Sequence, residues 1–263
     1  METFYSVFFI FCLTVGGGLF IKWLAETRFG TKSLESVPPR PNFMPYNFPL
    51  VVMLGWLMLT SLGSAAVENL TSQMADWRQK LIVFSCFFVI EAAAVIFIVY
   101  SAKKYFIDGL YGFGIRLKTI FRDFGFAVAV FISVWPFVML ALSAVVVLGK
   151  YFVGPDFNLE KNEGLVVLLE YKQLSLRILM IIFAAVLTPI FEEFVFRGLI
   201  QTYFRQTLGY GPWQSILLTS AIFSLLHPLM HLPAIFILSA AMGYAYEKSG
   251  SILRSIFVHL LFN

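Results

Sequence analysis

The chain has 263 residues, of which 59% are hydrophobic and 13% charged, and its formal net charge is +4. Because a soluble domain carries about 25% charged residues, the composition excludes an ordinary soluble protein. The small positive charge gives no reason to expect a nucleic-acid partner, since basic residues beside membrane spans have a simpler role in orientation. The two cysteines, Cys12 and Cys86, lie in apolar runs. We expect them to be packing residues rather than a disulfide or a metal pair.

Long apolar runs recur along the whole chain. A helix of about 20 apolar residues spans a bilayer, so the sequence predicts an all-α fold, a polytopic transmembrane helix bundle of about eight spans. The predicted spans lie near 4–23, 48–66, 81–101, 125–149, 174–204, 213–228, 233–247 and 251–263. The first follows an acidic start and reads as a retained span rather than a cleavable signal. We expect an integral multi-pass membrane protein, in a bacterial host one of the inner membrane.

The chain divides into an N-terminal four-helix membrane region, 1–173, and a second membrane region, 174–263. The basic residues orient the bundle. Twelve of the 19 follow odd-numbered spans or flank them: Lys22, Arg28, Lys32, Arg40, Lys103, Lys104, Arg116, Lys118, Arg122, Arg205, Lys248 and Arg254. Five follow even-numbered spans: Arg78, Lys80, Lys150, Lys161 and Lys172. This excess predicts that the odd connections are cytoplasmic and that both termini are outside.

Ionisable residues inside the predicted spans are candidates for function, because placing them in a membrane is costly. Glu91 is alone in its span, and a hydrogen bond to a neighbouring helix accounts for it. Glu192 and Glu193 are adjacent and point about 100° apart on a helix. Glu193 and Arg197 are four residues apart in the order that favours pairing, which leaves Glu192 free to face a polar cavity.

All three histidines of the chain lie after residue 226. His227 ends the sixth predicted span, and His259 shares a helix face with Asn263 in the last one. His231 lies between Pro228 and Pro233, which interrupt the helix, so we expect it in a turn outside the site. If the fifth span continues to about residue 204, Glu192 lies roughly 18 Å from its end, at a depth that overlaps those of the histidines.

Three motifs on these apolar segments resemble the CPBP family, which contains the type II CAAX prenyl endopeptidases and bacterial membrane proteins of bacteriocin processing or self-immunity. The family pattern is Glu-Glu-x-x-x-Arg, then Phe-x-x-x-His, then His-x-x-x-Asn. This sequence supplies Glu192, Glu193, Arg197, Phe223, His227, His259 and Asn263. The resemblance covers about 174–263 and implies an intramembrane endopeptidase that cleaves a membrane-associated protein or peptide, either a CAAX-type prenyl protein or a peptide-maturation substrate.

The resemblance also implies a role for each residue. Glu192 and His227 activate the attacking water, and His259 with Asn263 holds the oxyanion. The residues implied to support the site are Glu193, Arg197 and Phe223. The chemistry agrees, since peptide hydrolysis needs a base for water and donors for the oxyanion. We favour a metal-free mechanism without a cofactor, although Glu192, His227 and His259 could supply the ligands of a catalytic zinc.

Two other functions stay open. Buried Glu and His residues could relay protons in a membrane transporter, although the chain shows no pair of similar halves. A non-catalytic immunity or partner-binding member of the same family would keep the motif residues without turnover. A cleaved peptide, an ion-coupled flux or capture without cleavage would distinguish these functions. The expected partners are the lipid bilayer and a membrane protein or peptide substrate, and the sequence leaves the oligomeric state open.

Overall fold

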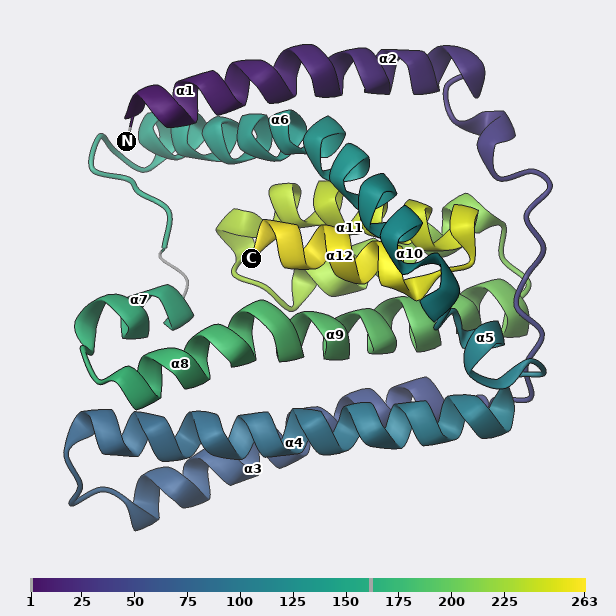
Figure 1. Cartoon of the computed structure of the whole chain (residues 1–263). Coiled ribbons are helices and arrows are strands. Elements are labelled where there is room, and N and C mark those ends of the chain that lie inside the picture. The colour runs from purple at the N-terminus through teal and green to yellow at the C-terminus, as the bar shows by residue number, and fades with distance from the viewer. Residues whose placement is uncertain (1, 161–162) are drawn as a thin grey trace.

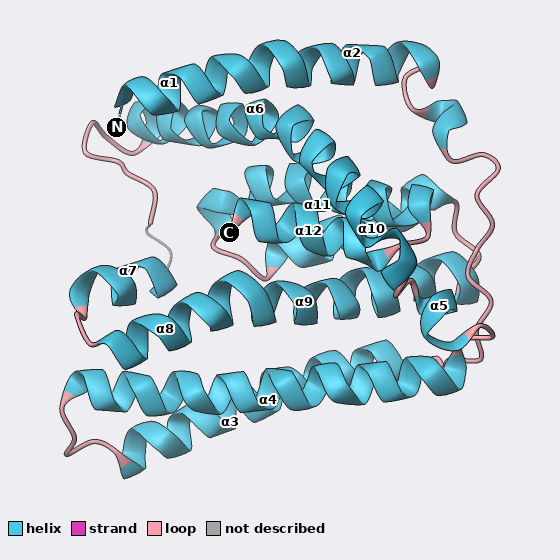
Figure 2. Cartoon of the chain, in the orientation of Figure 1, coloured by secondary structure: helices cyan, strands magenta, loops and turns pink. Residues whose placement is uncertain are grey.

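The computed structural model describes residues 2–160 and 163–263. Lys161, counted above among the basic residues, lies outside the described residues. Within the described parts of the chain, all regular secondary structure is helical, and the connections are loops and turns (Figure 2). The predicted all-α membrane fold is therefore confirmed.

Helices occupy all eight predicted places. The first helix consists of α1 (Glu2–Phe11) and α2 (Gly17–Glu26), joined by the π-helical turn Cys12–Gly16. The long helices that follow are α3 (Phe48–Leu70), α4 (Asp76–Tyr105), α6 (Ile120–Phe152) and the run from α8 (Leu174–Ile182) through α9 (Thr188–Glu193) to Thr207. The C-terminal helices are α10 (Pro212–Leu225), α11 (Leu232–Ser249) and α12 (Ile252–Phe262). Two short helices, α5 (Gly109–Phe113) and α7 (Glu163–Glu170), lie in the connections.

Six of the helices in the described residues are long and apolar enough to cross a bilayer. Two helices at predicted span positions, α10 and α12, have 14 and 11 residues and are shorter than a span requires. The estimate of about eight spans thus resolves into six long helices and two short ones. The proline interruption is present as expected, because α10 ends before Pro228 and α11 begins beside Pro233.

The helices form successive layers (Figure 1). The antiparallel pair α3 and α4 lies on one side, where α4 packs against α8 and α9, and α9 in turn contacts α12. The other face of the C-terminal helices is covered by α6, which contacts α11 and α12 and carries the first helix on its outer side. The division into 1–173 and 174–263 stays a prediction, and helices from both parts pack directly against each other.

One glycine of the first helix permits the closest packing in this outer layer. A side chain at Gly16 would overlap the backbone of Ile132 in α6, whereas side chains at Gly17 and Gly18 would meet open space. Small residues allow membrane helices to approach closely. Of the three consecutive glycines, Gly16 is therefore the one that sets the contact between the first helix and α6.

The connections after odd-numbered spans meet at one end of the bundle. Arg205, near the end of the fifth long helix, donates to the Val37 carbonyl in the first connection at 2.8 Å. Arg116, in the third connection, donates to the carbonyl of Ser249 at the end of α11 at 3.1 Å. A contact between two even-numbered connections joins His231 and Glu160. Successive connections therefore lie at opposite ends of the bundle, which is compatible with the distribution of the basic residues.

This arrangement makes the orientation testable by cysteine labelling. With Cys12 and Cys86 replaced, single cysteines at positions 35 and 210 should react with an impermeant maleimide from the cytoplasmic side, and a cysteine at 160 from the outside, because basic residues favour the cytoplasm. A cysteine at position 110 should react from the cytoplasmic side, like the cysteines at 35 and 210. Labelling of positions 35 and 160 from the same side would contradict the topology.

Candidate functional site

The candidate site is built around one long helix in the middle of the bundle. The helix continues without interruption from Leu174 to Thr207, so Glu192 and Arg197 lie well inside it. This was the condition for Glu192 to lie at the same depth as the histidines. The segment Phe194–Gln201 has π-helical geometry. Such turns inside α-helices are frequent at functional sites. All eight of its residues are buried, so this helix is enclosed by its neighbours at that depth.

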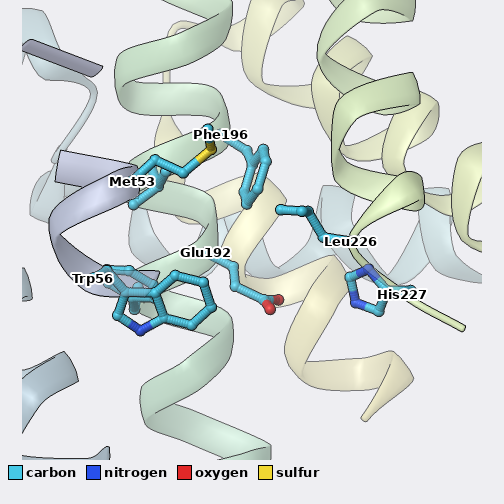
Figure 3. A pocket seen from close by; sticks show the side chains of 8 residues that line it. Met53, Trp56, Glu192, Phe196, Leu226 and His227 are labelled. Atoms are coloured by element: carbon cyan, nitrogen blue, oxygen red, sulfur yellow. The ribbon is translucent and has the colours of Figure 1, made fainter. Parts of the chain in front are cut away.

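A cavity of about 70 Å³ opens beside this helix. This volume is sufficient for more than one water molecule. Its walls come from α3, from the long helix and from the end of α10, and the lining residues are Met53, Trp56, Phe191, Glu192, Val195, Phe196, Leu226 and His227. Figure 3 shows the Glu192 carboxylate pointing toward the His227 ring, with Trp56 on the other side of the carboxylate. The cavity thus places two polar side chains against an apolar wall.

The second acid of the motif faces away from the cavity. Arg197 Nη1 donates to Glu193 Oε1 at 2.7 Å, and both side chains are fully buried. Arg197 Nη2 also donates to the carbonyl and hydroxyl oxygens of Ser239 in α11, at 3.1 and 2.7 Å. The predicted i,i+4 pair is therefore present, and it also connects the long helix to α11. A buried pair of this kind is costly to break.

His259 connects the two acids. Its Nδ1 lies 3.0 Å from Glu193 Oε1, and its Nε2 lies 3.5 Å from Glu192 Oε2. Because ionised Glu193 can only accept a hydrogen bond, the Nδ1 atom of His259 carries the proton at this contact. The ring orientation is then fixed by Glu193, and Nε2 is directed toward Glu192. His259 is buried, whereas the Glu192 side chain is 17% exposed and remains open to water in the cavity.

Phe223 holds the histidines from α10. Its ring lies 4.7 Å from the ring of His227 and 6.0 Å from that of His259, measured between centroids, and the Arg197 guanidinium lies 4.9 Å from its centre. His227 Nδ1 lies 2.9 Å from the Phe223 carbonyl oxygen. Since a carbonyl only accepts, Nδ1 carries the proton and Nε2 of His227 is left free for a partner.

Two further polar residues are not brought into the cavity. The Asn263 side chain is exposed, and its Nδ2 donates to the carbonyl of Ala184 at 3.1 Å. It therefore does not present its amide beside His259 in this arrangement. His231 lies in the turn Leu229–His231, and its Nε2 lies 3.0 Å from the Glu160 carbonyl oxygen. This position agrees with the expectation that the prolines place His231 in a turn.

The candidate zinc ligands can also be located. Among the described residues, no three His, Cys, Asp or Glu side chains are arranged as a group that could hold a metal ion. The Nε2 atom of His259 faces Glu192, and the Nδ1 atoms of His227 and His259 each have an acceptor. Metal-binding histidines commonly have such an acceptor for the other ring nitrogen, so this feature fits a metal site and a metal-free site equally. The choice between the two mechanisms stays a prediction.

Some contributors to the site were not identified from the sequence. Met53 and Trp56 lie in α3, far from the three motifs and in a span with no ionisable residue near them. Ser239 is one of many small polar residues in apolar helices, and nothing in its local sequence marks it as a partner of Arg197. Glu91 behaves as expected for a structural acid, since its Oε2 accepts a hydrogen bond from Thr188 Oγ1 on the neighbouring helix at 2.8 Å.

The comparisons with known proteins concern the same part of the chain. Residues 174–263 match the family model described as type II CAAX prenyl endopeptidase Rce1-like. A protein of Escherichia coli, described as an uncharacterized 24.3 kDa protein, is 26% identical over 126 residues, which cover 46% of this chain and 58% of that protein. The chain thus matches little more than half the length of this relative. No solved structure matches it.

The family match begins at the first residue of α8 and includes every motif residue of the site, while α3, which supplies Met53 and Trp56, lies outside it. It agrees with the resemblance to type II CAAX prenyl endopeptidases inferred from the motifs. The six long apolar helices in the described part of the chain, together with this match, establish an integral multi-pass membrane protein. The C-terminal third of the chain, which holds the candidate site, is similar to the Rce1-like family of type II CAAX prenyl endopeptidases, and this is a protease family.

Proposed function

We propose that the chain is an intramembrane endopeptidase that cleaves a membrane-associated protein or peptide with a water molecule activated by Glu192. The observation that carries the proposal is the cavity shared by Glu192 and His227, inside a bundle of largely apolar helices. The substrates are of the kind that the matched family's description suggests, a CAAX-type prenyl protein, or a peptide that matures by cleavage at the membrane.

In the proposed reaction, a water molecule lies between Glu192 and the free Nε2 of His227. Glu192 takes a proton from this water as the water oxygen attacks the carbonyl carbon of the scissile peptide bond. The negative charge that forms on the carbonyl oxygen needs donors, and one such donor contributes about 3–4 kcal/mol to lowering the barrier. Glu192 then gives the proton to the leaving nitrogen as the C–N bond breaks.

Two residues can supply the donors for the oxyanion. His259 has its ring fixed by Glu193 and its Nε2 next to Glu192, and because Nδ1 already carries a proton, Nε2 donates to the oxyanion in the doubly protonated ring. Asn263 would have to leave the Ala184 carbonyl to act beside it. Catalytic hydrogen bonds often form only when the substrate is bound, so we retain the pair His259 and Asn263 in this role.

The proposal is tested by comparing membrane peptides from cells that express either the native chain or the Glu192→Ala variant. Mass spectrometry should find peptides with a new terminus only with the native chain. A transporter would give an ion-coupled flux and no new termini. A non-catalytic partner-binding protein would retain a peptide without cutting it, so uncut peptide bound to both forms would contradict the proposal.

The metal-free mechanism makes its own prediction. Purified protein in detergent, stripped with 1,10-phenanthroline and dialysed, should keep full activity at far below one metal ion per chain, because Glu192 supplies the base. Metal content is measured on the same samples as activity. Activity that disappears on stripping and returns with zinc in a one-to-one ratio would instead assign Glu192, His227 and His259 as zinc ligands.

His231 provides a test of how far the site extends. The His231→Ala variant should keep more than about a tenth of the native rate, a barrier increase below about 1.4 kcal/mol, because this side chain contacts the Glu160 carbonyl in a turn. His227→Ala is the matched variant, and its loss should be much larger. An equally large loss in both would show that His231 belongs to the site.

A further inference from the structure

A second cavity lies at the end of the bundle where the odd-numbered connections meet. Its volume is about 350 Å³, several times that of the cavity beside Glu192. The lining residues come from the first connection, from the α5 region and from the end of α11, and the charged ones are Arg40, Asp108, Arg116, Glu247 and Lys248. Figure 1 shows the first connection running past α5 at this end of the molecule. None of these residues has a task in the proposed reaction.

The charges around this cavity do not cancel. Glu247 is fully buried, and two arginines neutralise it, with Arg40 Nη1 at 3.4 Å from one carboxylate oxygen and Arg205 Nε at 3.0 Å from the other. Asp108 is the other acid of the lining, and it is exposed. Two more cations, Arg116 and Lys248, complete the lining. The cavity and its buried pairs therefore carry an excess of positive charge.

The two remaining cations also have unused donors. Arg116 Nη1 donates to the Ser249 carbonyl, while its Nε is buried and has no hydrogen-bond partner among the described residues. Its guanidinium lies 4.3 Å from the centre of the Tyr111 ring, which holds it in place. Lys248 gives one hydrogen bond to the Ser33 carbonyl, and an ammonium has three donors. Arg116 Nη2 also makes no hydrogen bond among the described residues, so Nη2 and the remaining Lys248 donors are free to bind an anion in the cavity.

The surroundings favour an anion that belongs to a lipid. Three prolines of the lining, Pro38, Pro39 and Pro41, have fixed φ angles, and the wall is therefore formed before a ligand arrives. Close along the chain from Arg116 lie the large apolar side chains of Leu117 and Phe121, which are 68% and 90% exposed. In a membrane, basic pockets between helices bind lipid headgroups while exposed apolar side chains contact the acyl chains.

We propose that this cavity is a binding site for a phosphate group, with Arg116 and Lys248 as its principal ligands and an anionic membrane lipid as its source. Arg and Lys are the residues that bind phosphate in proteins, Arg through several directed donors and Lys as a point charge. A free phosphate ion shares the same chemistry, so the experiment includes it. The site is independent of peptide cleavage, and binding can be measured whether or not the chain is a peptidase.

The test is native mass spectrometry of the purified full-length chain after removal of lipid. The chain is incubated separately with phosphatidylglycerol, with phosphatidylcholine and with inorganic phosphate. We expect one phosphatidylglycerol to be retained in preference to phosphatidylcholine. Arg116→Gln combined with Lys248→Gln should weaken this binding by about tenfold or more, or about 1.4 kcal/mol, because both cationic ligands of the phosphate are removed.

The matched control is Lys103→Gln combined with Lys104→Gln. These two residues are exposed at the end of α4, so the control removes the same charge from the same end of the bundle but leaves the cavity intact. Its binding should stay within about twofold of the native chain. Equal losses in both double variants would overturn the site, because they would indicate a general attraction of basic surface for anions.

The remaining outcomes are also decisive. Retention of inorganic phosphate without phosphatidylglycerol, lost in the cavity variant, would keep the site and assign it to the free ion. Retention of neither ligand would overturn it. If the double variant is not stable enough to purify, Lys248→Gln alone is compared with Lys103→Gln, since both side chains are exposed. The cavity variant should then show the larger loss, and equal binding would reject the proposal.

Discussion

Replacing Glu192 by Gln should reduce peptide cleavage by at least about 100-fold, because a positioned general base contributes about 10²–10⁴ to the rate. Gln keeps the size of the side chain and can still hydrogen-bond, but it cannot take a proton from water. The carboxylate is partly exposed to the cavity and has no arginine partner in the described structure. The fold should therefore tolerate the change, and the variant's abundance in the membrane should stay near that of the native chain.

The measurement is the initial rate of cleavage for a peptide found in the comparative mass spectrometry, together with immunoblot quantitation of the membrane fraction. Glu68→Gln is the control, since it removes an exposed carboxylate from the end of α3. It should leave the rate unchanged. A Glu192→Gln variant that keeps its activity would exclude Glu192 as the base, and one that disappears from the membrane would show that the acid has a structural role.

Removing Arg197 should have the largest effect on stability. In Arg197→Ala, Glu193 remains fully buried without its cation, and breaking a buried ion pair in this way costs about 3–5 kcal/mol. The hydrogen bonds to Ser239 are lost as well. Since total stabilities are commonly about 5–15 kcal/mol, we expect a strongly reduced membrane abundance and a lower melting temperature in detergent.

A double variant separates the charge from the chemistry. Glu193→Gln combined with Arg197→Met leaves no unpaired charge at this position, and abundance should recover relative to Arg197→Ala. Cleavage should remain low, because His259 loses the carboxylate that fixes its ring. An Arg197→Ala variant that is abundant and fully active would contradict both the pairing and its role in the site.

The sequence alone predicted those features that depend on one helix at a time. The positions of the eight helices follow from runs of apolar residues, and the pairing of Glu193 with Arg197 follows from helical spacing. The predicted depth of Glu192 depended on the helix continuing through Arg197, and the structure meets this condition. α12 lies within one residue of its predicted bounds at each end, whereas α10 ends three residues before the predicted position, because the apolar Leu226 continues into the turn that follows.

Features that depend on how helices pack were not predictable in the same way. The spacing of His259 and Asn263 predicts that they share a helix face, but α12 ends at Phe262, and the Asn263 side chain donates to the Ala184 carbonyl of a neighbouring helix. Trp56 is one aromatic residue among many in the chain, and only the packing of α3 beside the long helix brings it to the cavity. Contacts between distant segments of apolar sequence have no local signal.

The wall that α3 contributes to the cavity has an evolutionary consequence. The reactive groups and the surface that faces them lie in different parts of the chain, one inside the segment that matches the family and the other outside it. Mutations in α3 can therefore change the size and shape of the space beside Glu192 while the acids and histidines stay as they are. Relatives that share the C-terminal helices could in this way acquire different preferences by drift in a single N-terminal helix.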